Sequence, residues 1–263
     1  FRIKAGKNVD LSKHSADFTD GFTDKKEAEA DLAKNIERMT ELQDMLYAQD
    51  VYSLLVVFQA MDAAGKDGAI KHVMSGVNPQ GVSVASFKAP SAEERDHDFL
   101  WRHQKALPER GKIGIFNRSH YEDVLVGRVR SLAPKQAIEQ RYGQINAFEQ
   151  ILAENGTVIL KFMLHISRKE QGERLKERLD EPGKNWKFNA GDLEDRKLWT
   201  DYQKAYEIAL SRCSSEWAPW VVVPADRKWA RNCIIAAIVR KTLETMNPKY
   251  PKMPWKPSDF TID

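Results

Sequence analysis

A lysine that follows a glycine turn is the sequence feature with the clearest chemical potential. The turn is Ala60-Met61-Asp62-Ala63-Ala64-Gly65-Lys66-Asp67-Gly68, and it links an apolar run to a helical pattern. In such a segment, backbone N–H groups and a helix N-terminus surround phosphate oxygens, and the lysine adds a point charge. We predict a catalytic role for Lys66 and phosphate or nucleotide binding by its neighbours Ala63, Ala64, Gly65, Asp67 and Gly68.

The turn departs from the phosphate-loop consensus G-x-x-x-x-G-K-[ST] at two positions. Ala60 stands in place of the first glycine, and Asp67 replaces the Ser or Thr that would hold Mg²⁺. Asp62 adds a carboxylate that would repel phosphates by itself. It is explained if it binds Mg²⁺ or takes a proton from the acceptor, and the alternative is an Asx-turn that only stabilises the loop.

A second polar cluster ends another apolar run, Ile115-Phe116-Asn117-Arg118-Ser119-His120-Tyr121-Glu122-Asp123. Asn117 occupies the place of the usual metal-binding aspartate, and we predict that it lies in the phosphate or nucleotide site. Arg118 is suited to neutralise a phosphoryl group in transfer, and Glu122 to supply the metal ligand that Asn117 lacks. The alternative for Glu122 and Asp123 is the preference of acids for a helix N-terminus.

Two arginines further along the chain share one face of a predicted helix, because Arg174 and Arg178 are four residues apart. A pair of guanidinium groups on one face is suited to hold an anion, so we predict a catalytic role for Arg178 and a binding role for Arg174. Neighbouring glutamates offer the alternative of an ion-paired helix face exposed to solvent.

These residues must be positioned by alternating strands and helices. Short apolar, β-branched runs predict five strands, at residues 53–58, 82–85, 113–116, 158–162 and 220–223. Helical patterns separate or follow them, at residues 68–77, 92–106, 135–154, 192–211 and 227–245, and an amphipathic helix that includes Leu32 to Leu46 precedes the first strand. The alternation predicts a three-layer α/β/α domain with a mainly parallel sheet, whose ligands bind beyond the carboxyl ends of the strands.

We predict a single domain over residues 1–263 with three peripheral parts. Residues 1–22 are polar and are expected to form an N-terminal arm outside the core. Residues 165–191 form a helical lid module, in which a helix from Ser167 to Leu179 is followed by the loop Lys184–Phe188. Residues 247–263 contain four prolines and are expected to form an extended tail on the surface.

Composition excludes several classes of protein. Of the 263 residues, 42% are hydrophobic and 30% charged, which is typical of a globular domain and not of a disordered or fibrous chain. Cys213 and Cys233 are too few for a disulfide scaffold and favour a reducing compartment. No apolar run approaches the ~18 residues of a membrane span. The net charge of +3 predicts no nucleic-acid partner.

At four places the sequence resembles the polyphosphate kinase 2 family. Residues 55–68 resemble its Walker A segment, and residues 116–125 its Walker B segment. The other two blocks are residues 170–179 with 185–188, and residues 218–229. The resemblance extends from about Leu32 to Arg231. It implies a kinase-like phosphate-loop fold with a helical lid.

The resemblance also implies an activity: the reversible, Mg²⁺-dependent transfer of a terminal phosphoryl group between inorganic polyphosphate and nucleotides, with Mn²⁺ as an alternative metal. The pattern at Asn117 and Glu122 resembles the subgroup that converts AMP to ADP and ADP to ATP. The family's functional positions match Asp62, Lys66, Asn117, Arg118, Glu122 and Arg178, with a weaker match at Arg174. Asp62 and Glu122 are the implied metal ligands, and a cytoplasmic homodimer or homotetramer is the implied assembly.

Two other functions stay open from the residues. One is an ATP-dependent small-molecule kinase on the same fold, and the other is a non-catalytic polyphosphate-binding protein. Ala60 bears on turnover, because the family commonly has glycine there. If that position requires a positive φ, Ala60 strains the loop.

Overall fold

A five-stranded sheet forms the centre of the computed structural model, which describes residues 1–262. Its strand order is β2-β3-β1-β4-β5, and all four pairs of neighbouring strands are parallel. The strands are β1 (Ser53–Ala60), β2 (Val82–Ser86), β3 (Ile113–Asn117), β4 (Thr157–His165) and β5 (Trp220–Pro224). The predicted fold class and all five predicted strands are confirmed.

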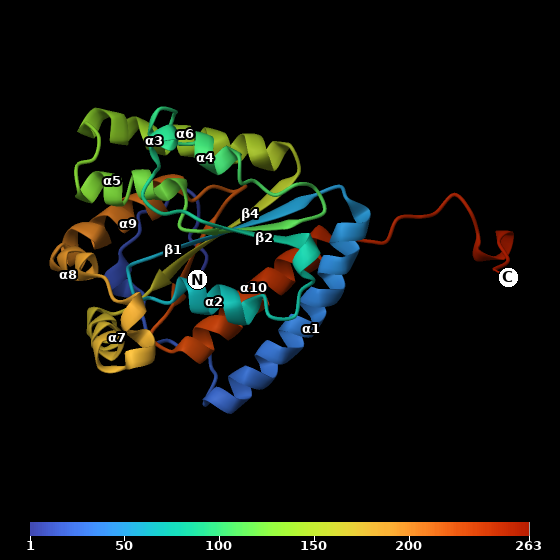
Figure 1. The fold of residues 1–263 in the computed structure, drawn as a ribbon, viewed down its shortest axis with the longest axis horizontal. Coiled ribbons are helices and arrows are strands. Elements are labelled where there is room, and N and C mark those ends of the chain that lie inside the picture. The colour runs from blue at the N-terminus through green and yellow to red at the C-terminus, as the bar shows by residue number, and fades with distance from the viewer. Residues whose placement is uncertain (263) are drawn as a thin grey trace.

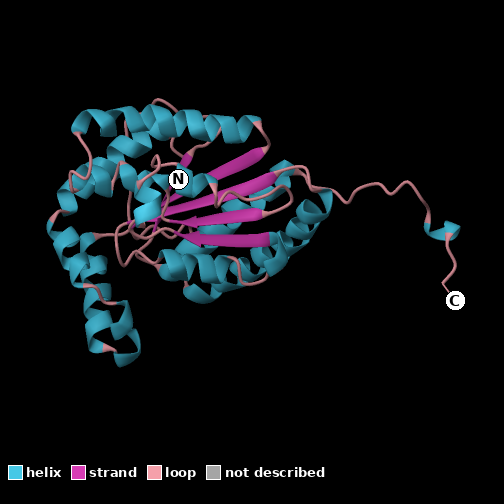
Figure 2. Ribbon diagram, turned by 45° about the horizontal axis from the view of Figure 1, so that its top comes forward, coloured by secondary structure: helices cyan, strands magenta, loops and turns pink. Residues whose placement is uncertain are grey.

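Helices cover both faces of this sheet (Figures 1 and 2). One layer contains α1 (Lys25–Gln49), α2 (Lys66–Val73) and α10 (Lys228–Met246), and α10 packs against both of the others. The opposite layer contains α5 (Val126–Val129), α6 (Lys135–Glu154) and α9 (Trp199–Cys213). Because both faces are covered, β1 is buried along its whole length, which explains its uninterrupted apolar run.

The strand order decides where the site forms. β1 lies between β3 and β4, and Phe58 of β1 is in register with Asn117 of β3. The segments that leave the carboxyl ends of β1, β3 and β4 therefore meet at one edge of the sheet. The segment after β4 continues into α7 (Arg168–Asp180) and the 3-10 helix η4 (Pro182–Lys187).

Two predicted helices are wrong as single elements. Residues 92–106 form two four-residue helices, α3 (Ala92–Arg95) and α4 (Trp101–Gln104), because the Asp98 side chain accepts a hydrogen bond from the Leu100 N–H and starts a new turn. Residues 192–211 are divided between α8 (Ala190–Lys197) and α9. Leu198 leaves helical geometry there, next to Asp195, which is held by the side chains of Arg130 and Tyr202.

The N-terminal arm differs in part from its prediction. It is largely irregular, but Ile3 and Leu11 are buried in the main hydrophobic core. The backbone of Phe1 and Ile3 also pairs with the outer edge of β5 through an antiparallel bridge between Arg2 and Val221. Polar composition concealed these contacts, because a short segment beside an edge strand needs few apolar residues to attach.

The proline-rich tail stays in contact with α1 as far as Tyr250, whose hydroxyl donates to the Asp44 carboxylate, and its described residues beyond that point, up to 262, extend away from the body (Figure 1). Residue 263 lies outside the described residues. Both cysteines are buried and unpaired. Within residues 1–262, none of the helices has the length and apolar character that crossing a membrane would require.

Candidate active site

The loop between β1 and α2 has the backbone geometry of a phosphate-binding turn. Gly65 adopts φ +97°, and Ala63 adopts φ +62°, so the left-handed residues lie inside the loop. Ala60 is the last residue of β1 and is not among the described residues with positive φ, so the strain considered for it is absent. Beyond Gly65, the first turn of α2 presents backbone N–H groups that have no helical acceptor.

Lys66 is the first residue of α2, and its side chain returns over the loop. Its Nζ donates a hydrogen bond to the Ala60 carbonyl, at 3.0 Å. Burial and the nearby Arg118 lower the pKa of Lys66, while three carboxylates oppose this shift. A lysine held in this way projects one positive charge into the mouth of the loop.

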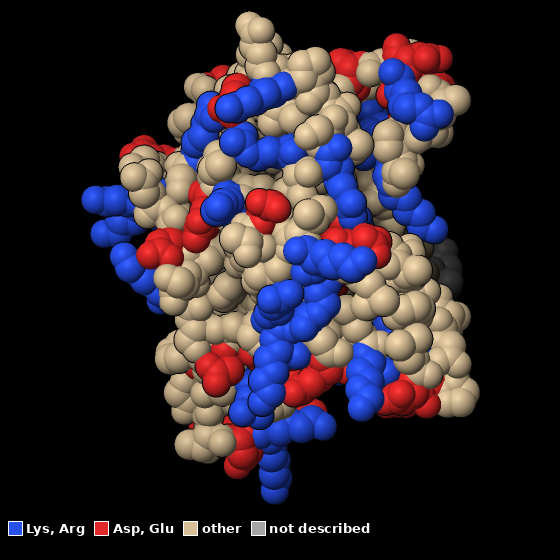
Figure 3. Space-filling model, turned by 90° about the vertical axis from the view of Figure 1, so that its left-hand side faces the viewer, with Lys and Arg blue, Asp and Glu red and all other residues tan. Residues whose placement is uncertain are grey.

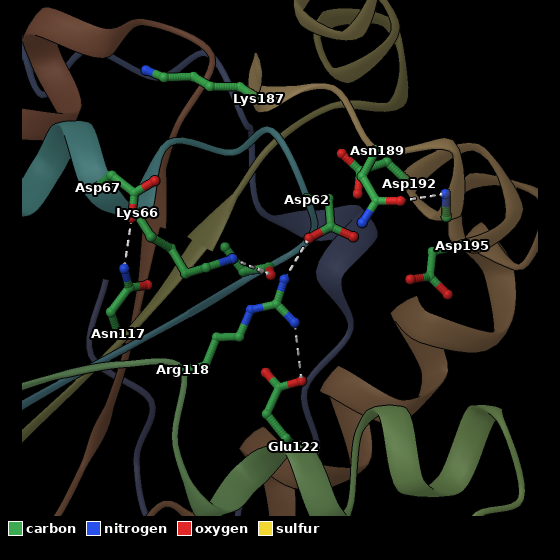
Figure 4. Close-up of polar contacts among 12 residues, drawn as sticks. Asp62, Lys66, Asp67, Asn117, Arg118, Glu122, Lys187, Asn189, Asp192 and Asp195 are labelled. Carbon is green, nitrogen blue, oxygen red and sulfur yellow. Dashed lines mark hydrogen bonds and ion pairs between the residues drawn. The ribbon is translucent and has the colours of Figure 1, made fainter. Parts of the chain in front are cut away.

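Arg118 joins two carboxylates that come from different elements. It follows β3 in a left-handed conformation with φ +64°, and its backbone N–H donates to the Phe58 carbonyl. Its Nη2 lies 2.9 Å from the Asp62 Oδ1, and its Nη1 lies 3.6 Å from the Glu122 Oε2 (Figure 4). Although burial opposes the shift, the carboxylates of Glu122 and Asp62 raise the pKa of Arg118. A strained backbone that is held so firmly is typical of functional sites.

Glu122 and Asp62 are similarly enclosed, with side chains 17% and 18% exposed. Burial raises the pKa of Glu122, and the positive charges of Arg118 and Lys66 counteract this. Asp123, next along the chain, lies elsewhere: its Oδ1 is 3.2 Å from the Arg141 Nη1. The acids of this segment therefore separate, with Glu122 in the site and Asp123 paired with α6.

Asn117 and Asp67 contact each other across the loop. The Asn117 Nδ2 donates to the Asp67 Oδ1, at 2.6 Å (Figure 4). This bond ties the carboxyl end of β3 to the first turn of α2. The Asn117 amide thus orients Asp67, which the sequence alone did not connect with β3.

The two arginines of α7 have different surroundings. The Arg178 Nη1 lies 2.8 Å from the Asp192 Oδ2 and also donates to the Lys187 carbonyl. Arg174 is buried, and all five of its N–H donors have acceptors. Its Nε binds Glu170, and its two Nη atoms bind the carbonyl oxygens of Ala63, Ala64, Ala225 and Asp226.

This environment corrects the prediction that Arg174 binds phosphate or nucleotide. A guanidinium whose donors are all occupied by the protein has none left for an anion. Arg174 instead ties the loop after β1 to the segment after β5. The periodicity placed both arginines on one helix face correctly, but it did not show that the inner one is covered by the loop.

A cavity of about 580 Å³ connects these groups. Most of the predicted residues line it, and Trp186, Lys187 and Asn189 form its far wall. Its five basic residues face three acids, Asp62, Asp67 and Asp192. Figure 3 shows the corresponding end of the molecule, where Lys and Arg side chains form a band with acidic side chains beside it. The anion site therefore arises from local clustering in a chain of nearly neutral net charge. The basic lining residues are Lys66, Lys88, Arg118, Arg178 and Lys187.

Glu122 lies outside this cavity and lines a smaller adjoining one with Asp62, Arg118, Asp195 and two tyrosines. Sequence reasoning missed several of the surrounding residues. Asp192 and Lys88 both line the larger cavity, although neither belongs to the motifs that predict the site. They had no motif of their own, because each reaches the site through the fold and not through spacing along the chain.

The arrangement is that of the P-loop kinases, in which a phosphate-binding loop leaves a central strand of a parallel sheet. The family model for polyphosphate kinase 2 matches residues 22–251, and the chain therefore belongs to the polyphosphate kinase 2 family. This membership confirms the resemblance seen in the sequence.

Individual relatives agree with this membership. The chain is 49% identical to an AMP/ADP-polyphosphate phosphotransferase of Meiothermus ruber, over 96% of this chain and 95% of the relative. It is 48% identical to an ADP-polyphosphate phosphotransferase of Rhodopseudomonas palustris, over 96% of this chain and 91% of the relative. The crystal structure of a polyphosphate kinase 2 from Arthrobacter aurescens superimposes with a TM-score of 0.94 at 42% identity, covering 97% of this chain and 92% of the other.

Proposed function

We propose that this protein transfers the terminal phosphoryl group of inorganic polyphosphate to AMP and to ADP, in a reversible reaction that forms ADP and ATP. The observation that carries the proposal is the position of Arg118, which bridges Asp62 and Glu122 beside the Lys66 loop. This set joins the charges that phosphoryl transfer requires at one place. The Meiothermus and Rhodopseudomonas relatives, which are polyphosphate phosphotransferases, support polyphosphate as donor.

The charged residues of the site have different proposed roles in phosphoryl transfer. Lys66 and the N–H groups at the start of α2 hold the phosphate oxygens. Arg118 offsets the charge that develops on the moving group, and Arg178 adds a second guanidinium from α7. Asp62 pairs with Arg118 and would orient the attacking acceptor oxygen. With donor and acceptor held in line, the transfer would need no covalent participation by the protein.

Closure of residues 165–191 over the cavity is the proposed means of excluding water. This segment bears Arg178 and forms the far wall of the cavity through Trp186 and Lys187. Transfer to a nucleotide in preference to water requires that bulk solvent leave the site before the donor reacts. The ion pair between Arg178 and Asp192 holds the segment to α8.

Asp62 and Glu122 fit the requirements of Mg²⁺, with Mn²⁺ as an alternative. Among residues 1–262, no cluster of three or more acidic, His or Cys side chains is arranged around a common metal position. Mg²⁺ is commonly bound by only one or two carboxylates, with phosphate oxygens and water completing its shell, so two carboxylates suffice here. When bound, the metal would neutralise phosphate charge. We infer that Arg118 then shares these two carboxylates with it.

The two-step acceptor range rests on Asn117. An aspartate there would place a second carboxylate against Asp67, whereas the amide donates to it at 2.6 Å. The loop thus has one negative charge fewer near bound phosphate, and the pattern at Asn117 and Glu122 is the one that resembles the two-step subgroup. We further propose, from the family resemblance, a cytoplasmic location and a homodimer or homotetramer. Light scattering of the purified protein tests the oligomeric state, and cell fractionation tests the location.

A coupled luciferase assay tests the function directly. The full chain is mixed with Mg²⁺, long-chain polyphosphate and either ADP or AMP, and ATP is followed over time. We expect ATP from both acceptors and none when polyphosphate is omitted. ATP from ADP alone would limit the enzyme to one step. Absence of ATP from both acceptors, with polyphosphate still bound, would overturn the enzymatic proposal in favour of a binding protein.

A further inference from the structure

A second buried arginine, Arg231 of α10, lies directly beneath the phosphate loop. Its side chain is 2% exposed, and it is not among the residues that line the cavity. A Cβ atom at Gly65 would lie 2.3 Å from the Arg231 Nη1, and one at Gly68 would lie 3.6 Å from the Nη2. The guanidinium therefore packs against the backbone of the loop, on the side away from the cavity.

The positive charge of Arg231 has no carboxylate partner in the part of the chain that the structure describes. Its Nη1 donates to the Ala64 carbonyl at 3.0 Å, and its Nε and Nη2 donate to the Asn232 Oδ1 at 3.1 and 2.7 Å. All of these acceptors are neutral oxygens. Arg174, the neighbouring guanidinium, has one carboxylate partner, Glu170. The two buried arginines thus carry one positive charge in excess.

An unbalanced charge of this kind is costly inside a protein. Burial and the proximity of Arg174 lower the pKa of Arg231 to about 9. The cost falls when an anion binds nearby. Here the anion site of the loop lies on the other side of a single layer of backbone, around Gly65.

The same two arginines fix the orientation of the loop peptides. Both donate to the Ala64 carbonyl, at 3.0 Å from Arg231 and 2.9 Å from Arg174. Because the peptide group is planar and trans, the Gly65 N–H must point away from them. Gly65 lines the cavity, so this donor is turned towards the side where phosphate would bind.

We propose that Arg231 is a positioning residue for phosphate, which orients the Gly65 N–H through the Ala64 carbonyl and supplies a positive charge from behind the loop that bound phosphate balances. This inference rests on the proposed function, because it requires that the loop bind phosphate. It assigns part of the anion affinity to a residue that touches no ligand.

Two variants separate the charge of Arg231 from its hydrogen bond. Arg231→Lys keeps the charge and a donor for the Ala64 carbonyl, whereas Arg231→Gln keeps only a donor. Arg240→Gln is the matched control. Arg240 lies on the same helix, but it binds Asn35 of α1 and Glu244 of α10, so this variant removes an equal charge away from the loop.

The full-length proteins are compared by calorimetric titration with inorganic tripolyphosphate at constant ionic strength, and by kcat and KM for polyphosphate. We expect Arg231→Gln to raise the tripolyphosphate Kd and the polyphosphate KM at least about tenfold, because at an effective dielectric constant of ~20 one unit charge is worth a factor of ten even at ~12 Å from its partner. The Arg231→Lys and Arg240→Gln variants should stay within about threefold of the wild type. Thermal unfolding without ligand shows whether each variant is folded.

Equal weakening in the Lys and Gln variants would overturn the proposed role of charge, because it would show that only the shape of arginine matters. Wild-type affinity in a folded Arg231→Gln would overturn the whole inference. Failure of the proposed function is a different result: the wild-type protein itself would then show neither tripolyphosphate binding nor turnover. If Arg231→Gln does not fold, a Kd for Arg231→Lys more than about tenfold above that of the wild type would refute the inference.

Discussion

Substitution of Gly65 by alanine tests whether the observed loop conformation is the active one. Gly65 has φ +97° and ψ 38°, a left-handed conformation that costs an alanine about 1–2 kcal/mol. The new Cβ would also meet the Arg231 Nη1 at 2.3 Å, so the guanidinium must move. Arg231 is held by the Ala64 carbonyl and Asn232, and losing one such bond costs about 1–2 kcal/mol.

The two costs together destabilise the active conformation of the loop by about 2–4 kcal/mol. Since ~1.4 kcal/mol corresponds to a tenfold change, we expect kcat/KM for ADP with polyphosphate to fall by roughly 30- to 700-fold. The luciferase assay measures this change. The control is Gly143→Ala on α6, where a Cβ would meet nothing within 4 Å. This control should keep its activity and gain about 0.5–1 kcal/mol of stability. A Gly65→Ala enzyme with nearly wild-type kcat/KM would refute the reasoning.

Three further predictions concern the charges and the core. Lys66→Ala and Arg118→Ala should each lower kcat at least ~10²-fold, the scale of one removed electrostatic donor; near-wild-type rates in either would contradict the assigned roles. Lys161 is fully buried, and its Nζ lies 2.5 Å from the Glu149 Oε2. Replacing Lys161 with Met should lower the free energy of unfolding by about 3–5 kcal/mol, because the buried Glu149 carboxylate then lacks its lysine partner. Urea unfolding measures this loss, and a Lys161→Met/Glu149→Leu double variant should recover part of it. Burial raises the pKa of the Cys213 thiol to about 12 from 9.0. The stability that comes from the neutral thiol is therefore present below pH 9 and is lost as pH rises towards 12. A thiol reagent should label Cys213 only after unfolding, and rapid labelling of the native protein would argue against this burial.

The sheet was predictable because its signal is local. Residues 53–58 form a short run that is apolar on both faces and rich in β-branched residues, which favours a strand covered on both sides. Residues 92–106 failed as a single helix, because the interruption depends on one aspartate side chain and not on hydrophobic period. The prediction for the N-terminal arm was wrong in part, because Ile3 and Leu11 enter the core as isolated residues that no periodicity indicates.

The residues of the candidate site also differ in whether the sequence alone predicts their roles. Asp62, Lys66, Arg118 and Glu122 each lie in a segment that ends a strand, so the sequence predicts that they belong to one edge of the sheet. Arg174 and Arg178 look equivalent by spacing. Only the packed structure shows that Arg174 is covered by the loop after β1, whereas Arg178 lines the cavity.

The sequence by itself therefore determined the family, the fold class and the segments that carry the chemistry, because these depend on residue types and on spacings within one element. The tertiary structure alone decided which charges meet. Arg118 pairs with Asp62, 56 positions away, and Arg231 donates to the Ala64 carbonyl, 167 positions away, because β1, β3 and α10 converge at that edge. Electrostatic energy depends on distance through space, and residues so far apart in the chain have no local pattern that reports it.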